Sequence, residues 1–344
     1  MKHMLNTLYI TQPKSFLCKE GETVVVKQEE KKIVQIPIHT LGQIVCFGFE
    51  IVITPALMEL CAEKGVGIAW LSDSGKFLGR VEGAIKGNVL LRRAQYRWAE
   101  DPVKSLGVAK CMVAAKINNS RINLLRFLRN QPNYEPQEKI RESIDQLARL
   151  LVDIERCSDM EHLRGIEGEA AGYYFGVFDH LIVQQKEAFR FVKRTKRPPL
   201  DRVNALLSFI YTLLLFDIRS ALETVGLDPY VGFLHVDRPG RPSLALDLME
   251  EFRAPFADRL VLSLINLRQI QREHFMMHET GEVELEKDAR KNVIIAYQNR
   301  KKECIQHPFL GEKMEIGLVF HTQAQLLARH IRGDLSFYPA MIWK

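Results

Sequence analysis

The amino-acid sequence predicts an α+β protein, with a small β-rich domain at residues 1–85 and a larger all-helical domain at residues 86–344. Two observations predict this division. Short runs of β-branched and aromatic residues, separated by turn signals, dominate the first part of the chain, whereas helical periodicity runs through almost all of the rest. A chain of 344 residues is also long enough for two or three domains, each with its own core.

The β-rich domain is justified by its alternating runs and by one capped helix. Strands are expected at Thr7–Thr11, Thr23–Lys27, Lys32–Pro37, Gln43–Phe47, Gly67–Leu71 and Phe77–Val81. A helix from about Pro55 to Lys64 interrupts them, because Thr54 is a good N-cap and Gly65 is a good terminator. A short linker near residues 83–87 then leads into the second domain.

The helical domain is justified by apolar spacing and by end signals. After Pro136, apolar residues recur on one face as far as Ile154, which predicts an amphipathic helix. Asp201 is an N-cap for a helix to about Glu223, which Gly226 ends. Further helices are predicted at 258–274 and 286–303, and the apolar tail 337–343 is expected to pack against the domain.

Composition excludes several classes of protein. Hydrophobic residues make up 47% and charged residues 26%, an ordinary globular balance. The six cysteines lie far apart without a C-x-x-C pair, which favours reduced thiols over disulfides or a thiolate zinc site. The longest apolar stretch, residues 205–216, is too short to span a bilayer. We therefore expect a cytoplasmic protein that does not enter a membrane.

Positive charge is concentrated in the second domain. Residues 1–85 carry 9 basic and 9 acidic residues, so the net charge of +6 comes from residues 86–344, with 39 basic and 33 acidic. Within them, residues 86–129 have 10 basic residues and 2 acids, and residues 186–202 have 7 and 2. One such run is commonly a solvated helix face, but two runs interleaved with aromatic residues favour a nucleic-acid backbone as the partner.

The first candidate site residue is Glu167. Helical spacing places Glu167 on an otherwise apolar stripe that includes Leu163, Ala170 and Tyr174, so the pattern buries a carboxylate. A buried carboxylate requires either a metal ion or a cationic partner. This segment alone favours a structural ion pair over metal ligation.

The second candidate group is His235 with Asp247 and Glu250. His235 ends an apolar run, and the two acids are three residues apart on a predicted helix, hence on one face. A histidine and carboxylates without cysteine suit Mg²⁺ or Mn²⁺ better than structural zinc, and the imidazole favours manganese. The alternative is a core histidine beside exposed acids, and spacing does not separate Glu250 from Glu251 as a ligand.

Candidate phosphate contacts are of two kinds. Lys110 and Arg121 are three helical turns apart, and a stiff Arg194-Thr195-Lys196-Arg197-Pro198-Pro199 segment precedes a helix with a polar stripe. Surface charge and ordinary core hydrogen bonds are the alternative explanation. The residues expected to contact DNA are Lys110, Arg121, Arg194, Lys196, Arg197, Asn204, Ser208 and Tyr211.

An ordered set of motifs gives the chain a specific resemblance. They are Cys46-Phe47-Gly48, Gly67-Ile68-Ala69, Gly165-Ile166-Glu167-Gly168, Arg197-Pro198-Pro199, Gly226-Leu227-Asp228-Pro229, Gly232-Phe233-Leu234-His235 and Leu246-Asp247-Leu248-Met249-Glu250-Glu251-Phe252-Arg253. In this order they resemble the CRISPR-associated Cas-one (Cas1) family of spacer-acquisition integrases over nearly the full length. The closing Tyr338-Pro339 and Trp343-Lys344 are similar to the type I-C variant.

The resemblance implies a function and a ligand set. Glu167, His235 and Glu250 would bind the metal, Asp247 would be an additional active-site acid, and Glu251 would be dispensable for activity. The family's activity implies an endonuclease and integrase that inserts short duplex DNA into the repeat array by transesterification from a 3′-hydroxyl. Its partners would be double-stranded DNA, a second copy of the chain bound through the β-rich domain, and the Cas-two (Cas2) protein.

Other classes of function fit parts of the same sequence. A metal-dependent nuclease of DNA repair or of a mobile element would share the ligands. A non-catalytic DNA-binding scaffold would need only the basic runs, and a small-molecule metallohydrolase would not need them.

Overall fold

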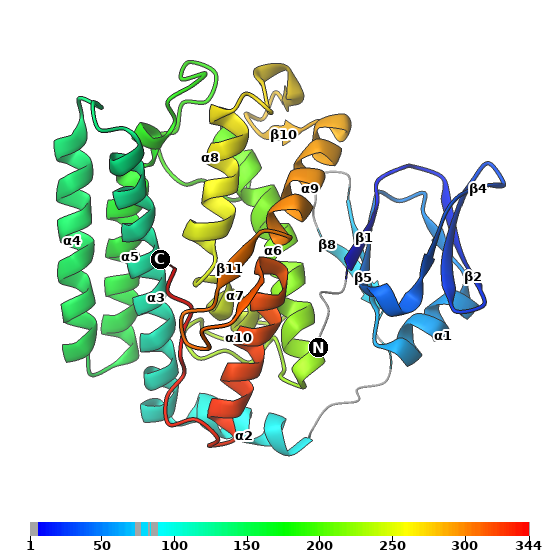
Figure 1. The fold of residues 1–344 in the computed structure, drawn as a ribbon, viewed down its shortest axis with the longest axis horizontal. Coiled ribbons are helices and arrows are strands. Elements are labelled where there is room, and N and C mark those ends of the chain that lie inside the picture. The colour runs from blue at the N-terminus through cyan, green and yellow to red at the C-terminus, as the bar shows by residue number, and fades with distance from the viewer. Residues whose placement is uncertain (1–5, 73–76, 82, 84–88, 344) are drawn as a thin grey trace. The chain divides into compact units, whose positions relative to one another are not determined.

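Strands come first and helices follow in this chain. The computed structural model describes residues 6–72, 77–81, 83 and 89–343, and it divides into two units, Met1–Gly87 and Asn88–Lys344 (Figure 1). The first unit contains strands and one α-helix, and the second is mainly helical. The predicted α+β class is therefore confirmed. The division lies two residues after the boundary at residue 85 that the sequence suggests.

Two four-stranded sheets form the first unit. One has the order β1-β5-β7-β8, with β1, β5 and β7 parallel and β8 antiparallel. The other has the order β4-β3-β2-β6. The strands are β1 (Asn6–Ile10), β2 (Ser15–Glu20), β3 (Thr23–Gln28), β4 (Lys31–Pro37), β5 (Leu41–Phe47), β6 (Val52–Ile53), β7 (Gly67–Leu71) and β8 (Phe77–Val81).

The core of the first unit is formed by side chains from both sheets and from one helix. Helix α1 (Pro55–Lys64) begins after Thr54, whose hydroxyl accepts a hydrogen bond from the Leu57 amide, and ends at Gly65 in the left-handed conformation. Leu57, Val24 and Ile44 are fully buried in one cluster with the other inward-facing strand residues. The predicted cap residues of this helix are confirmed.

Strand β4 is an exposed edge. It pairs only with β3 among the described strands, and Ile33 and Val34 on it are 54% and 37% exposed. An edge with exposed apolar side chains is a site at which another polypeptide can add or pack.

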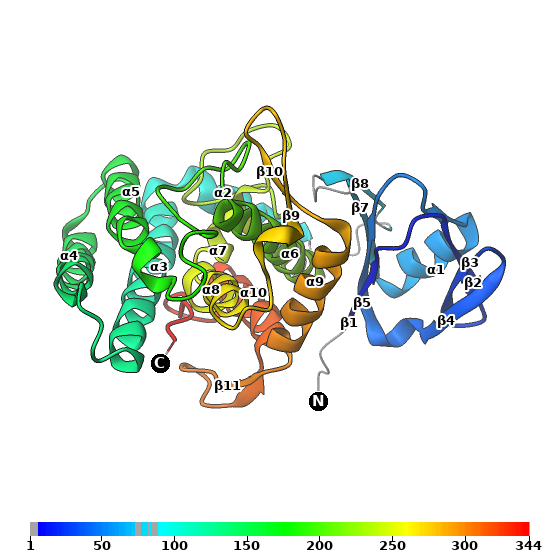
Figure 2. The same ribbon diagram turned by 90° about the horizontal axis from the view of Figure 1, so that it is seen from above.

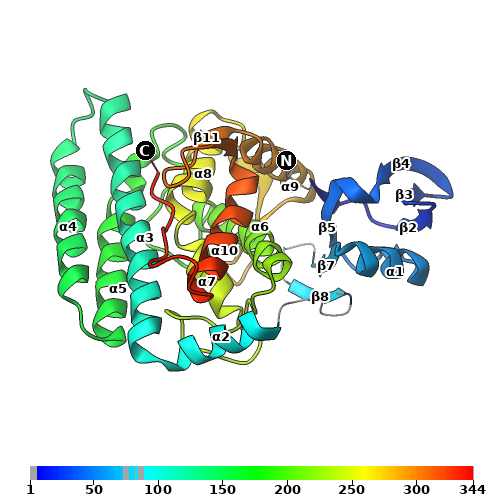
Figure 3. The ribbon, with the colours of Figure 1, turned by 60° about the horizontal axis from the view of Figure 1, so that its bottom comes forward.

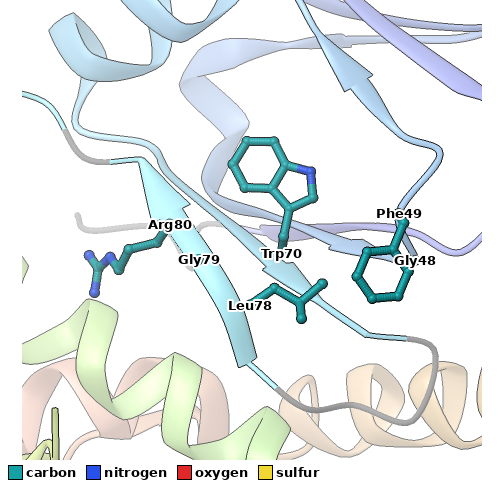
Figure 4. Close-up of a pocket in the computed structure, with 6 residues that line it drawn as sticks. All are labelled: Gly48, Phe49, Trp70, Leu78, Gly79 and Arg80. Carbon is teal, nitrogen blue, oxygen red and sulfur yellow. The ribbon is translucent and has the colours of Figure 1, made fainter.

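A pocket of about 420 Å³ opens on the first unit. It is lined by Gly48, Phe49, Trp70, Leu78, Gly79 and Arg80 (Figure 4). Its lining contains no carboxylate or imidazole, so it offers no ligands for the chemistry that the motifs predict.

The second unit is built from two groups of helices. Helices α3 (Pro102–Asn130), α4 (Gln137–Arg156) and α5 (Met160–Gly176) pack side by side, and Figure 2 shows the same three from above. Helix α6 (Arg202–Val225) packs against α7 (Ser243–Met249) and α10 (Ile316–Ile331), and α2 (Val89–Glu100) packs against α3 and α10. The other elements are η2 (Phe178–Leu181), the π-helical η3 (Arg253–Asp258), α8 (Arg259–Asn266), η4 (Arg272–His274), α9 (Lys287–Lys301) and the hairpins β9 (Phe275–Met277)–β10 (Val283–Leu285) and β11 (Cys304–Gln306)–β12 (Lys313–Glu315).

Helix α6 is the apolar centre of this unit. Asp201 caps its N-terminus by accepting a hydrogen bond from the Asn204 amide at 2.8 Å, and Gly226 ends it with φ 89°, as predicted. The helix is long and apolar enough to cross a membrane, but 72% of its most apolar window is buried within the protein. Its hydrophobicity is thus used in packing against neighbouring helices.

Several sequence predictions about secondary structure were wrong. The second domain was expected to be all-helical; it is mainly helical, but it also contains the hairpins β9–β10 and β11–β12. The helix expected over 258–274 ends at Asn266, because the Asn266 side chain bonds to Leu181, Val183 and Gln184 and Arg268 takes a left-handed φ of 54°. Strand β2 was missed because its sequence, SFLCKE, contains no β-branched residue.

Candidate metal centre

A lysine joins two of the predicted metal ligands. Glu167 lies on α5 and Glu250 follows the last residue of α7, far apart in sequence. Lys116, on α3, contacts Glu167 Oε1 and lies 2.8 Å from Glu250 Oε2. The Glu250 side chain is 4% exposed and that of Glu167 is 28% exposed. The site therefore has one buried acid, Glu250, and one partly exposed acid, Glu167, which the helical pattern had predicted to be buried.

Arg253 supplies a second positive charge. Its Nε lies 3.3 Å from Glu250 Oε1, and its guanidinium stacks on the ring of Tyr211 at 4.6 Å. Burial acts to raise the pKa of Glu250, but the charges of Arg253 and Lys116 outweigh it and hold that pKa well below its usual range. Glu250 is therefore ionised at neutral pH, as a metal ligand must be.

Asp247 organises the loop that carries His235. The carboxylate is fully buried, and it accepts hydrogen bonds from the backbone amides of Phe233 at 2.7 Å, Leu234 at 3.0 Å and His235 at 3.0 Å. It also lies 2.5 Å from His235 Nδ1. A methyl group at Gly232 would stand 2.7 Å from Asp247 Oδ2, so this loop requires glycine there.

These contacts give Asp247 a positioning role. Each of its oxygens already accepts two hydrogen bonds, which leaves little capacity for a metal ion. Nδ1–H of His235 donates to the carboxylate, so the lone pair of the imidazole is on Nε2, the arrangement found behind metal-bound histidines. Among the described residues, Nε2 has no hydrogen-bond partner.

The donor set fits a hard divalent cation, although the side chains stand apart. Within the described ranges, no three acid, histidine or cysteine side chains are placed to hold a metal ion together. The physical reason is Lys116, which occupies the space between Glu167 and Glu250. Glu250 Oε2 is buried and receives no well-directed hydrogen bond there, so it retains a free lone pair. Carboxylate oxygens with one imidazole suit Mg²⁺ or Mn²⁺.

Four of the predicted DNA contacts form one internal network. Arg194 donates to Asn204 Oδ1 at 2.7 Å and to Ser208 Oγ at 3.2 Å, and it lies over the Tyr211 ring at 5.4 Å. The buried Tyr211 donates to Asp258 at 2.5 Å. Because Arg253 stacks on the same ring, this network supports the acid cluster from behind. These side chains are engaged within the protein.

The other four predicted contacts are more accessible. Lys196 and Arg197 are exposed on the segment before α6. Lys110 and Arg121 lie on α3, half-buried, and Lys110 donates to the Glu155 carbonyl of α4 at 3.4 Å. The structure thus separates a buried group near the acids from basic residues at the surface.

The sequence interpretation missed the roles of three residues in or beside the site. Lys116 was counted only as part of a basic run, and Arg253 only as the end of a motif. The signal for Lys116 was present: it interrupts the small and apolar stretch Met112–Ile117, where a lysine needs an anionic partner. A Cβ atom added at Gly165, Gly168 or Gly172 of α5 would meet no other atom within 4 Å, so no neighbouring helix in the described part of the chain approaches the backbone there.

Glu251, the third residue whose role the sequence did not predict, anchors the C-terminal segment. Its fully buried carboxylate accepts hydrogen bonds from the Tyr338 hydroxyl at 2.6 Å, the Gln323 amide at 2.8 Å and the Met341 backbone at 2.7 Å. The expectation that Glu251 is dispensable for activity followed from assigning the ligand role to Glu250, and the structure places Glu251 against the C-terminal segment rather than in the acid cluster. Figure 3 shows this segment, in red, beside α3.

Asn119 of α3 binds the same C-terminal segment, so that Glu251 and Asn119 together form a clamp on it. It donates to the carbonyls of Glu251 at 2.9 Å and Met341 at 2.8 Å, and it accepts from the Trp343 amide at 2.9 Å. The expected packing of the tail is confirmed, and it joins two elements that carry the acid site.

Known proteins resemble this chain over its whole length. Residues 8–299 match the family described as "CRISPR associated protein Cas1". A CRISPR-associated endonuclease Cas1 from Chlorobaculum tepidum is 52% identical over 100% of both chains, and one from Moorella thermoacetica is 47% identical over 100% of both.

Solved structures agree with the sequence relatives. A Cas1 protein from Thermotoga maritima superposes with a TM-score of 0.80 at 25% identity, covering 95% of this chain and 97% of the other. A casposase bound to integration product shares the fold, with a TM-score of 0.84 at 22% identity over 99% and 95%. By its motifs, its fold and its full-length relatives, the chain belongs to the Cas1 family of CRISPR-associated proteins.

Proposed function

We propose that this protein is a metal-dependent DNA endonuclease and integrase of CRISPR adaptation that acts in the cytoplasm. It would insert short duplex DNA into the repeat array, using the 3′-hydroxyl of the incoming strand as the nucleophile. The observation that carries the proposal is the pairing of the Glu167 and Glu250 carboxylates across Lys116, together with an imidazole that Asp247 orients, in a member of the Cas1 family.

Glu167, His235 and Glu250 would hold one Mg²⁺ or Mn²⁺. The bound ion would polarise the scissile phosphate and stabilise the charge that develops on it. The protein's own residues fix the geometry: Asp247 keeps Nε2 of His235 free for coordination, and Arg253 keeps Glu250 ionised and oriented.

The reaction needs no covalent protein intermediate. A 3′-hydroxyl oxygen forms a bond to phosphorus while the phosphodiester bond of the target strand breaks, leaving a new 3′-hydroxyl. If water takes the place of the hydroxyl, the same site hydrolyses DNA, which accounts for both activities. Phosphoryl transfer depends mainly on positioning and charge stabilisation, which this site supplies.

The partners follow from the surfaces and the relatives. Lys196 and Arg197 are exposed cations near the site's supporting network and would hold the DNA backbone without reading its sequence. Dimerisation through the exposed strand β4 would pair two such chains. A Cas2 protein is the expected third component, because one solved structural neighbour of this fold is a Cas6-RT-Cas1–Cas2 complex.

Strand transfer into a repeat-bearing plasmid tests the proposal. With Mn²⁺ and Cas2 present, a duplex ending in 3′-hydroxyl should be joined to the plasmid, and a 3′-deoxy duplex should not. Glu167→Ala, His235→Ala and Glu250→Ala should each abolish joining. Glu169→Ala is the matched control, since Glu169 lies on the same helix but is exposed. Full joining by any of the three ligand variants would remove that residue from the metal site.

A non-catalytic scaffold and a nuclease outside CRISPR predict different results. The scaffold would bind DNA without metal-dependent joining or cleavage. A repair nuclease would cleave DNA but would not prefer a repeat-bearing target over a matched plasmid without repeats.

A further inference from the structure

Lys116 is a buried ammonium in a place where the proposed function requires a metal ion. Its side chain is 15% exposed, and its neighbours Ala115 and Ile117 on α3 are fully buried. It contacts Glu167 and lies 2.8 Å from Glu250, the two carboxylates proposed as ligands. Lysine is rarely buried unless it is paired, so its position depends on these two acids.

The two carboxylates beside this lysine are matched by cations without a metal ion. Lys116 and Arg253 bring two positive charges to the negative charges of Glu167 and Glu250. Burying Glu250 without nearby cations would be very costly. The ammonium therefore performs, in the metal-free protein, the electrostatic task that a divalent ion would otherwise perform.

We infer that Lys116 is an internal counter-ion of the metal centre, which occupies the site in the metal-free protein and is displaced when a divalent ion binds. This inference rests on the proposed function, because it assumes that Glu167 and Glu250 are metal ligands. It adds that metal affinity is set by competition between the ion and this lysine.

Charge repulsion makes the two occupants compete for the same carboxylates. Mg²⁺ holds carboxylate oxygens at about 2.0–2.1 Å, closer than the 2.8 Å between Lys116 Nζ and Glu250 Oε2. A cation bound there would repel an ammonium that remained between the same two carboxylates. Lysine can leave, because its charge sits at the end of a flexible four-carbon stem.

Metal binding by substituted proteins tests the inference. Lys116→Gln retains hydrogen-bond donors but removes the competing charge, and Lys116→Arg retains the charge. In calorimetric titrations with Mn²⁺, Lys116→Gln should bind at least about tenfold more tightly than the wild type, as expected for the loss of one close like-charge interaction. Lys116→Arg should stay within about threefold, and the metal-free melting temperature of Lys116→Gln should fall because Glu250 loses its partner.

A measurement on the unsubstituted protein covers the case in which Lys116→Gln does not fold. The side-chain ammonium signals of ¹³C,¹⁵N-lysine-labelled protein can be followed by NMR during titration with diamagnetic Mg²⁺, and Lys116→Arg assigns the signal. Displacement predicts that the Lys116 signal shifts and that its amine protons exchange faster with water as Mg²⁺ saturates the site.

The outcomes separate this inference from the proposed function. If wild type, Lys116→Gln and Lys116→Arg bind Mn²⁺ equally, or if Mg²⁺ leaves the Lys116 signal unchanged while Glu167→Gln abolishes binding, the counter-ion role is overturned and the metal site stands. If none of these proteins binds either ion at millimolar concentration, the metal site itself fails.

Discussion

Replacing Asp247 by asparagine should damage the site although it alters only one atom. Each oxygen of the carboxylate accepts two hydrogen bonds. Oδ2 accepts from the backbone amides of Phe233 and Leu234, and Oδ1 accepts from the backbone amide and Nδ1 of His235. Asparagine has one acceptor oxygen, so one pair must face an NH₂ group. The less costly orientation keeps the Oδ2 pair, because Nδ1 of His235 can change tautomer and accept a hydrogen bond from that NH₂ group.

The magnitude follows from the groups left without partners. In that orientation the backbone amide of His235 loses its acceptor, which costs about 1–3 kcal/mol of unfolding free energy, or roughly 2–12 °C in melting temperature for a unit of this size. The changed tautomer places the proton on Nε2, so the lone pair needed for coordination is lost. Mn²⁺ affinity should therefore fall by about 10- to 100-fold, the range found for partners of metal-bound histidines.

Thermal unfolding and Mn²⁺ calorimetry measure the two effects separately. Asp145→Asn is the matched control, because it makes the same chemical change in an exposed side chain of α4, away from this loop. If Asp247→Asn matched this control in both stability and Mn²⁺ affinity, the assigned role of Asp247 in holding His235 would be refuted.

Three further predictions concern the tail, the dimer and DNA. Glu251→Ala should lower the free energy of unfolding by about 2–4 kcal/mol, measured with urea, because three buried donors lose their acceptor. Burial raises the pKa of Glu251 to about 7, so the folded state favours the protonated form of this side chain, and the free energy of unfolding should fall as pH rises from about 5 to 8. Glu251→Gln should lack this pH dependence. An identical pH profile in the two proteins would contradict the burial of an ionisable group at this position. Ile33→Glu on the exposed edge strand should convert dimers to monomers in light scattering, whereas an unchanged mass would place the interface elsewhere. Replacing both Lys196 and Arg197 by alanine should reduce the log–log salt slope of DNA affinity by about 0.9 per lost phosphate contact, equally for unrelated sequences, and an unchanged slope would show that neither side chain binds DNA.

Local patterns in the sequence predict the elements well where both ends carry chemical signals. Thr54 with Gly65, and Asp201 with Gly226, are N-cap and terminator pairs that act within one helical turn, and both helices form as expected. The helix expected to continue to His274 ends early because the Asn266 side chain bonds to residues about 80 positions away. Local periodicity contains no information about such a contact.

The same limit of local sequence patterns applies to the candidate metal centre. Glu167 and His235 could be singled out because each is a polar residue within an apolar pattern, although the structure leaves both side chains partly exposed. The pairing of Lys116 with Glu167 and Glu250 depends on how α3, α5 and α7 pack, and no spacing in the sequence encodes it. Glu250 and Glu251 are adjacent and identical in type, and only the tertiary structure gives one to the acid cluster and the other to the tail.

The clamp at Asn119 has a consequence for how the protein is made. Its side chain bonds to partners 132, 222 and 224 residues further along the chain. At about 5–20 residues per second, the ribosome needs roughly 10–45 s between adding Asn119 and adding Met341. During that interval α3 emerges from the ribosome, but the backbone groups that hydrogen-bond to the Asn119 side chain are not all available. The helical unit must therefore finish folding after synthesis has reached the tail, and nascent chains stopped before Tyr338 should be recognised by chaperones and proteases as incomplete.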